Sequence, residues 1–400
     1  MLFWMLCFAT RLTLTVRAFI VPSNYRSISS AGFTATRGAV NVIVAPASSR
    51  SFTTRLQSTI VNDNASMTEN VTSTSFDGVA DQGNSKKTYP LEMTEEERYL
   101  FDLNGFLIVR GVLSPEEVED ANRAIDRHAD EMVERSDDEL RNAKVGSRFF
   151  GKGPGRMDLG RSLEWGKKDS RVFKSILAHP RLVPIFHGIL GKGYRMDHLP
   201  MILAQNMGSE GFQLHGGTVD CTSGLYNPHL AYHCHHGTIQ SALLGCNVIL
   251  RDHNAGDGGF CIVPGSHKSN FKMPKGMVDG EKYEEYVLQP ATKAGDVILF
   301  SEGTVHGAKS WTSAEQRRTA LFRFTPATHV YGRSYFGHEG NGWPTGMYEN
   351  LTPAQRAVLE PPYANRLDRP NINEDGTVEI TTRNARKRQH DQDVFGTKYF

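Results

Sequence analysis

Short apolar runs separated by clusters of glycine, proline and aspartate fill the sequence from Leu199 to Pro326. The runs are rich in Val, Ile, Leu and Phe: LPMILAQN, GFQLH, GCNVILRD, GGFCIVPG, GDVILF and TALFRFTP. Runs of this length, with turn residues between them, are typical of strands in a sandwich or barrel rather than of helices in a bundle. The sequence therefore predicts a mainly β body.

Helices are expected on either side of this β region. Thr94–Glu97 and Ser114–Glu117 both have the form of a capping box, which marks the start of a helix. The first helix is expected to run through Leu100 and the second to about Arg135. Apolar residues at helical spacing predict a third helix between residues 180 and 191. The fold class predicted is mainly β with flanking helices.

The N-terminal segment has the composition of a targeting sequence. Residues 1–62 contain six arginines and no lysine, aspartate or glutamate. An apolar segment, Met1–Val16, is followed by Ala18-Phe19 and then by a stretch rich in Ser, Thr and Arg. This order resembles the bipartite plastid presequences of algae with complex plastids, with a mitochondrial presequence and a secretory signal as alternatives. We expect a presequence over residues 1–56.

The remaining chain is expected to form one main domain. Residues 57–88 are polar and predict a disordered linker. We expect the β domain with its N-terminal helices over 89–330, and a cover segment with a basic tail over 331–400. The net charge is +1 overall and −5 without the six arginines of the presequence, which argues against a nucleic-acid partner. No stable membrane span is expected in the mature protein.

Two histidines at the ends of predicted strands are the candidate metal ligands. His215 directly follows the run FQL, and His306 follows GDVILF after a short connection. Two neutral imidazoles on a rigid β scaffold suit Fe(II) oxygen chemistry, for which the usual third ligand is a carboxylate. The cluster His233–His236 is not expected to form a second iron site, because consecutive residues of an extended segment point to opposite sides. We expect it in a loop at the mouth of the barrel.

Several segments resemble the phytanoyl-CoA dioxygenase family of Fe(II)- and 2-oxoglutarate-dependent oxygenases. The resemblance covers roughly residues 95–326 and is carried by FDLNGFLIVRGVLSPEEV, NVILRDHNAGDGGFCIVPGSHKSNF, GDVILFSEGTVHG and RRTALFRF. It implies a double-stranded β-helix of the jelly-roll or cupin-like kind. It also implies Fe(II), 2-oxoglutarate as cosubstrate, ascorbate as an accessory reductant, O₂ and a small-molecule substrate.

The resemblance also assigns individual residues. His215 matches the first iron ligand of the family and His306 the distal histidine. Arg318 matches the arginine that holds the C5 carboxylate of 2-oxoglutarate. Because neighbouring strand residues point to opposite faces, Arg318 is expected to face the barrel interior and Arg317 to face outward. Arg323 shares the face of Arg317 and is the reserve candidate.

The sequence departs from the family at the third iron ligand. The family motif is His-x-Asp, whereas here His215 is followed by two glycines, with Gly217 at the carboxylate position. Three replacements are open: Asp220, a halide beside Gly217, and Glu302. A tight turn permitted by Gly303 would bring Glu302 back towards the imidazoles. We predict that Glu302 lies closer to them than Asp220 does.

Three functions follow from these alternatives. The first is a 2-oxoglutarate-dependent dioxygenase that hydroxylates or otherwise oxidises a small molecule. The second is a non-haem iron halogenase with a halide at the Gly217 position. The third is a barrel that binds a ligand without converting it. The joint presence of His215, His306 and Arg318 favours chemistry, because a binding protein has no need of all three.

Overall fold

The computed structural model describes residues 88–135, 143, 147–332, 335, 342–362, 369–380 and 384–396. The predicted presequence, residues 1–56, lies outside the described residues, as does the predicted linker, 57–88, except for its last residue. No helix among the described residues has the length and apolar character needed to cross a membrane.

Two antiparallel sheets form the body of the molecule. The larger sheet has the strand order β1-β11-β9-β13-β5-β3-β2, with β4 pairing to β13. Its strands are β1 (Phe106–Val109), β2 (Val133–Glu134), β3 (Met157–Leu159), β4 (Arg195–Met196), β5 (Met201–Gln205), β9 (Leu244–Ile249), β11 (Val297–Ser301) and β13 (Arg317–Thr325). The smaller sheet has the order β10-β12-β6, with bounds Gly259–Ile262, His306–Lys309 and Phe212–His215.

The chain alternates between these two sheets. Strand β5 lies in the larger sheet and β6 in the smaller, and β9 to β13 alternate in the same way. This alternation between two antiparallel sheets confirms the predicted double-stranded β-helix. Two hairpins lie outside the sheets: β7 (Tyr232–His235) with β8 (Thr238–Ser241), and β14 (Pro370–Ile372) with β15 (Val378–Ile380).

The predicted helices are present, with different ends. Both N-terminal capping boxes form, but the first helix continues to Asn104 and the second ends at Arg127. The helix predicted between residues 180 and 191 is present as Val183–Leu190, and a further helix, Lys167–Ile176, was not predicted. The helices are α1 (Glu95–Asn104), α2 (Pro115–Arg127), α3 (Lys167–Ile176), α4 (Val183–Leu190), α5 (Lys275–Val278), α6 (Pro353–Val358) and α7 (Ala385–Phe395), with 3₁₀ turns at Ala129–Glu131, Ser266–Lys268, Glu284–Tyr286 and Thr345–Tyr348.

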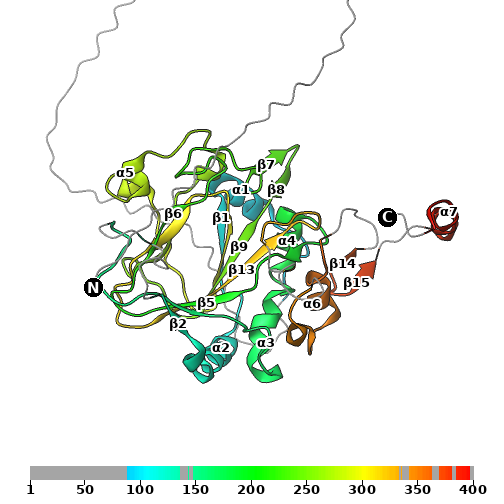
Figure 1. Cartoon of the computed structure of the whole chain (residues 1–400), viewed down its shortest axis with the longest axis horizontal. Helices are drawn as coiled ribbons and strands as arrows, with labels where there is room; N and C mark the ends of the chain where they lie inside the picture. The colour runs from blue at the N-terminus through cyan, green and yellow to red at the C-terminus, as the bar shows by residue number, and fades with distance from the viewer. Residues whose placement is uncertain are drawn as a thin grey trace, which may run out of the picture. The chain divides into compact units, whose positions relative to one another are not determined.

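Strand β13 separates the helix-covered core from the interior between the sheets. Its residues Ala320, Phe322 and Phe324 belong to the main hydrophobic core. There the ring of Phe324 packs 4.7 Å from that of Phe186 on α4. Figure 1 shows β1, β9, β13 and β5 side by side, with α4 and β6 on opposite sides of them. The alternate residues of β13 therefore face β6 and the smaller sheet.

The C-terminal segment contributes to the same core. Trp343, Met347 and Val358 are buried in the main cluster, and α6 contacts β4 of the larger sheet as well as the β14–β15 hairpin. Residues 342–372, where they are described, thus extend the core of the β domain.

The two faces of β13 give a prediction for stability. Phe322 is completely buried, so Phe322→Ala should lower the free energy of unfolding by about 3–5 kcal/mol through lost burial and a cavity. The control is Phe271→Ala at a side chain that is 83% exposed, where we expect a change within about 0.5 kcal/mol. Chemical denaturation of both variants measures the difference, and equal effects would contradict the proposed core.

Candidate metal centre

Two strands of the smaller sheet bring His215 and His306 together. His215 is the last residue of β6 and His306 the first of β12, and the two residues are directly paired in the antiparallel ladder. Their ring centroids are 4.3 Å apart. The ring of Phe300 on β11 packs 4.6 Å from that of His306. The sheet register itself therefore fixes the two imidazoles side by side.

Backbone carbonyls orient both imidazoles. Nδ1 of His215 lies 2.9 Å from the carbonyl oxygen of Gln213, and Nδ1 of His306 lies 2.8 Å from that of Thr304. Because a carbonyl can only accept, each Nδ1 carries the proton and each Nε2 keeps its lone pair. Burial, followed by the neighbouring His306, lowers the pKa of His215 to about 3, and burial also lowers the pKa of His306. Both rings are neutral, as metal ligands must be.

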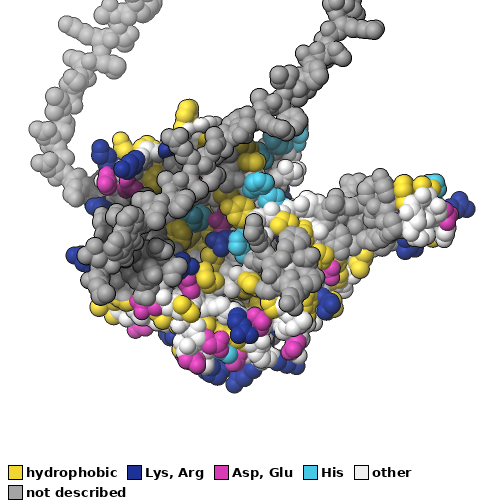
Figure 2. All heavy atoms as spheres, viewed as in Figure 1, with side chains coloured by type: hydrophobic (Ala, Val, Ile, Leu, Met, Phe, Trp, Pro, Cys, Tyr) yellow, Lys and Arg dark blue, Asp and Glu magenta, His cyan; other side chains and the backbone are white. Residues whose placement is uncertain are grey.

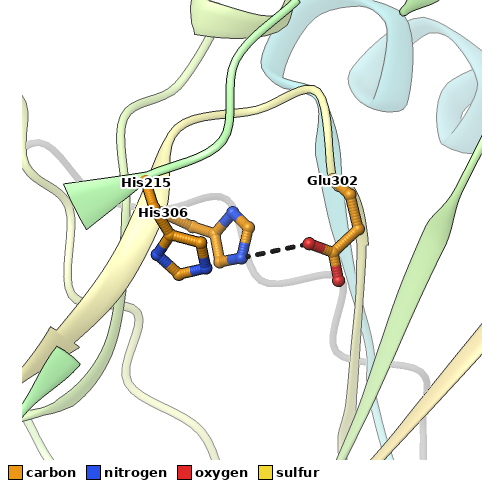
Figure 3. Close-up of side chains that lie close together, drawn as sticks. All are labelled: His215, Glu302 and His306. Carbon is orange, nitrogen blue, oxygen red and sulfur yellow. Dashed lines mark ion pairs between the residues drawn. The ribbon is translucent and has the colours of Figure 1, made fainter. Parts of the chain in front are cut away.

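Glu302 completes the cluster. A tight turn follows β11, with the amide of Thr304 donating to the carbonyl of Ser301 at 2.8 Å. This turn sends the chain back to His306, and the Glu302 carboxylate faces the two rings (Figure 3). Its Oε2 lies 3.5 Å from Nε2 of His306, and the ligand atoms of all three residues lie within 4.8 Å of one another. The predicted turn and the predicted approach of Glu302 are both present.

Asp220, the other candidate carboxylate, forms hydrogen bonds within its own turn and does not join the two histidines. Its Oδ1 accepts hydrogen bonds from the amides of Thr222 and Ser223, at 3.2 and 2.6 Å. The side chain therefore stabilises the turn after β6. Among the described residues it does not belong to the group that could hold a metal.

The charge of Glu302 is maintained by a neighbouring arginine. Nε of Arg323 on β13 donates to Oε1 of Glu302 at 2.5 Å. Burial opposes ionisation of this carboxyl, but the positive charge of Arg323 outweighs it and lowers the pKa of Glu302 to about 2. The cluster thus offers two neutral nitrogens and one anionic oxygen.

The glycines after His215 leave no room for the usual carboxylate. Gly217 has φ +100°, and a Cβ at this position would lie 2.5 Å from the carbonyl oxygen of Val219 and 3.3 Å from Cγ2 of Val305. A Cβ at Gly216, with φ +85°, would lie 2.8 Å from the carbonyl oxygen of Glu302. Both glycines are needed for the chain to pass close to the turn that carries Glu302.

The predicted directions of the Arg317 and Arg318 side chains are wrong: each faces the side expected for the other. Arg318 faces outward to α2, where its Nη2 pairs with Asp126 at 2.7 Å and its Nη1 lies 3.3 Å from Oδ1 of Asn122. Arg317 faces the interior instead and donates from Nη1 to Oε1 of Gln205 at 2.5 Å. The reason is the alternation of side chains along β13. Arg318 lies on the same face as the core residues of this strand, and helices cover that face.

Arg317 lines a cavity of roughly 320 Å³ that also contains both imidazoles. Four arginines line it: Arg135, Arg156, Arg317 and Arg323. The first two pair with Asp158 and Arg323 pairs with Glu302, whereas within the described part of the chain Arg317 pairs with no carboxylate. Figure 2 shows basic, acidic and histidine side chains together in a hollow of the visible face.

Among the residues that the structure describes, Arg317 is buried without a counter-ion. It is 3% exposed, and its Nε has no hydrogen-bond partner among these residues. Burial, followed by the positive charge of Arg156, lowers the pKa of Arg317 to about 9. A Cβ at Gly259 would lie 2.8 Å from this Nε, so the glycine makes space for the guanidinium. A buried cation of this kind is suited to a carboxylate ligand.

The other histidines singled out in the sequence lie apart from the cluster. His233–His236 belong to the exposed β7–β8 hairpin rather than to a loop, with the rings of His233 and His235 on one face, 5.9 Å apart. His267 is also apart from the cluster: it is buried, and its Nε2 lies 2.9 Å from the carbonyl oxygen of Asp102.

The sequence contained a signal that identifies Arg317. In RRTALFRF, alternate residues form an apolar face of Ala320, Phe322 and Phe324, which is typical of a strand face covered by helices. The opposite face, with Arg317 and Arg323, is the more polar one and is available to a ligand. No local signal identifies Gln205 or Arg156, which reach the cavity from β5 and from the segment before β3.

The close contacts at Gly217 give a prediction. Gly217→Ala should destabilise the fold through its positive φ and its contact with Val219, by about 1–3 kcal/mol. Gly237→Ala is the matched control, because Gly237 also has positive φ (+76°) but a methyl group added there would have no atom within 4 Å. Chemical denaturation should show the larger loss for Gly217→Ala, and an equal loss in the two variants would mean that the contact at Val219 does not matter.

The chain is similar to several known proteins. The chain is 21% identical over 239 residues to the ectoine dioxygenase of Nocardia farcinica, covering 54% of this chain and 72% of the relative. HygX from Streptomyces hygroscopicus, solved with nickel, 2-oxoglutarate and hygromycin B, is 21% identical, with TM-score 0.47, 59% of this chain and 89% of HygX covered. EctD from S. alaskensis is 16% identical, with TM-score 0.43, 70% of this chain and 89% of EctD covered.

The model of the phytanoyl-CoA dioxygenase family matches residues 101–319. This match spans more than half of the sequence, and the chain belongs to the phytanoyl-CoA dioxygenase family.

Proposed function

We propose that the protein is an Fe(II)- and 2-oxoglutarate-dependent oxygenase that oxidises a small molecule. In this proposal His215, His306 and Glu302 bind the iron and Arg317 binds the cosubstrate. The observation that carries it is the convergence of two imidazole Nε2 atoms and one carboxylate beside a buried arginine that has no carboxylate partner among the described residues.

The donor set fits Fe(II). Two histidines and one carboxylate that leave other coordination positions open form the facial triad of non-haem iron oxygenases. The chemistry that Fe(II) supplies in such a site is the activation of O₂, coupled to the oxidative decarboxylation of 2-oxoglutarate to succinate. The Nδ1–H groups of His215 and His306 donate to backbone carbonyls, and these hydrogen bonds hold each Nε2 in the direction of the metal.

Arg317 would fix the far end of the cosubstrate. Its guanidinium can form two parallel charge-assisted hydrogen bonds with one carboxylate. Such a carboxylate would also supply the missing counter-ion of the buried cation. Phe260 and Phe300 line the same cavity and keep apolar surface against His306, which limits the access of water to the reacting side.

The carboxylate of Glu302 favours oxygenation over halogenation. A halogenase needs a halide as the third ligand because it lacks the carboxylate, and here the Glu302 carboxylate lies beside the two imidazoles and can take that role. The buried Arg317 likewise favours a cosubstrate over a barrel that only binds a ligand. The ectoine dioxygenase relative supports small-molecule oxidation as the reaction class.

The function is tested by binding and consumption of 2-oxoglutarate in the full chain. With Mn(II) in place of iron, titration calorimetry should show 2-oxoglutarate binding to the unmodified protein. With Fe(II), ascorbate and O₂, succinate should form even without the primary substrate. Arg317→Gln should weaken 2-oxoglutarate binding roughly 10- to 100-fold, because it removes charge-assisted hydrogen bonds.

Arg318→Gln is the matched control, with the same change on the opposite face of the same strand. It should leave 2-oxoglutarate binding close to that of the unmodified chain. The reverse result for the two variants would overturn the assignment of Arg317. An unmodified chain that neither binds nor consumes 2-oxoglutarate would overturn the proposed function.

We also propose that residues 1–56 direct the protein to a plastid, on the basis of their arginine-rich, acid-free composition after an apolar segment. A fluorescent protein fused behind residues 1–88 should accumulate in the plastid of an alga with complex plastids. N-terminal sequencing of the native protein should find a start between Leu56 and Ser85. Accumulation in mitochondria, or an intact N-terminus, would contradict this proposal.

A further inference from the structure

The Glu302 carboxylate has a different partner on each of its two oxygens. Oε1 accepts the hydrogen bond from Nε of Arg323 at 2.5 Å. Oε2 lies on the side of the imidazoles, 3.5 Å from Nε2 of His306. In the described part of the chain, no other side chain forms a hydrogen bond or an ion pair with this carboxylate. Arg323 therefore determines which oxygen of Glu302 is directed to the histidines.

A glutamate in this position needs such a partner. Glu302 lies in a turn after β11, outside the sheet ladder, and its side chain has one more rotatable bond than the aspartate of the family motif. Fixing the rotamers of a glutamate side chain costs conformational entropy. A strong charge-assisted hydrogen bond from a fixed donor offsets this cost.

Arg323 is held by the most central strand of the larger sheet. β13 lies between β9 and β5, and Arg323 is paired with Gly245 of β9. Its side chain is 24% exposed, compared with 7% for Glu302. The guanidinium is therefore closer to solvent than the carboxylate to which it donates. The backbone position of the donor is therefore fixed independently of the turn that carries the acceptor.

Arg323 is distinct from the arginine proposed for the cosubstrate. Arg317 and Arg323 point to the same face of β13 and are six residues apart, which corresponds to about 20 Å along a strand. Arg317 pairs with the neutral Gln205, whereas Arg323 pairs with the anionic Glu302. The two arginines therefore serve different ends of the cavity.

We infer that Arg323 is the positioning residue of the metal centre: it acts through Glu302 and holds this displaced carboxylate in the orientation that binds the metal. The inference rests on the proposed function, because it takes Glu302 as a metal ligand. It adds that the replacement of the family's aspartate involves a pair of residues, a glutamate from the turn after β11 and an arginine from β13.

The test is a double-mutant cycle on Co(II) binding by the full chain in the absence of O₂. Arg323→Gln should weaken Co(II) binding about 10- to 100-fold, as is usual when a residue that supports a metal ligand is lost. Arg323→Lys, which keeps one charged donor, should restore part of that affinity. In a Glu302→Gln background, Arg323→Gln should change the affinity by less than about twofold, because the two changes act on one interaction.

A control and a spectroscopic readout separate this role from a general effect on folding. Arg318→Gln, the same change on the opposite face of β13, should bind Co(II) like the unmodified chain. The Co(II) absorption spectrum of Arg323→Gln should resemble that of Glu302→Gln, because both lose the oriented carboxylate. Unchanged binding by Arg323→Gln, or an equal loss with and without Glu302, would overturn the inference. Failure of the unmodified chain to bind Co(II) would instead overturn the proposed metal site.

Discussion

The pairing of β6 with β12 is the constraint on which the rest of the site depends. In an antiparallel ladder, directly opposed residues have neighbouring side chains, and this register opposes His215 to His306. A shift of either strand by one residue would turn one imidazole to the other face of the sheet. The pair of imidazoles is therefore a consequence of strand register, and the carbonyl partners of the two Nδ1 atoms only refine the orientation that the register provides.

The third member of the cluster, Glu302, is positioned by a turn rather than by strand register. The family places its carboxylate two residues after the first histidine, but here two glycines with positive φ follow His215. These glycines allow the chain to pass against the turn that carries Glu302. The loss of one carboxylate and the approach of another are thus two effects of the same close packing between the end of β6 and the turn after β11.

The electrostatics of the cavity are independent of the net charge of the chain. The chain carries a net charge of only +1, yet four arginines line one cavity of the β domain. Asp158 pairs with two of them and Glu302 with a third, and Arg317 is left with a neutral amide partner. A dicarboxylate is attracted by this local arrangement, because interactions between distant surface charges are screened by salt whereas those in a buried cavity are not.

The sequence by itself determined the fold class, the family and the two histidines. Each apolar run between Leu199 and Pro326 became a strand, and both capping boxes began helices, because these features depend on local periodicity and hydrogen bonding. Only the tertiary structure decided between Arg317 and Arg318, since the face of a strand is set by what packs on it. It also decided that Arg323 hydrogen-bonds to Glu302. This contact joins a turn to a distant strand and no spacing along the chain encodes it, whereas the approach of Glu302 to the histidines was expected from the turn at Gly303.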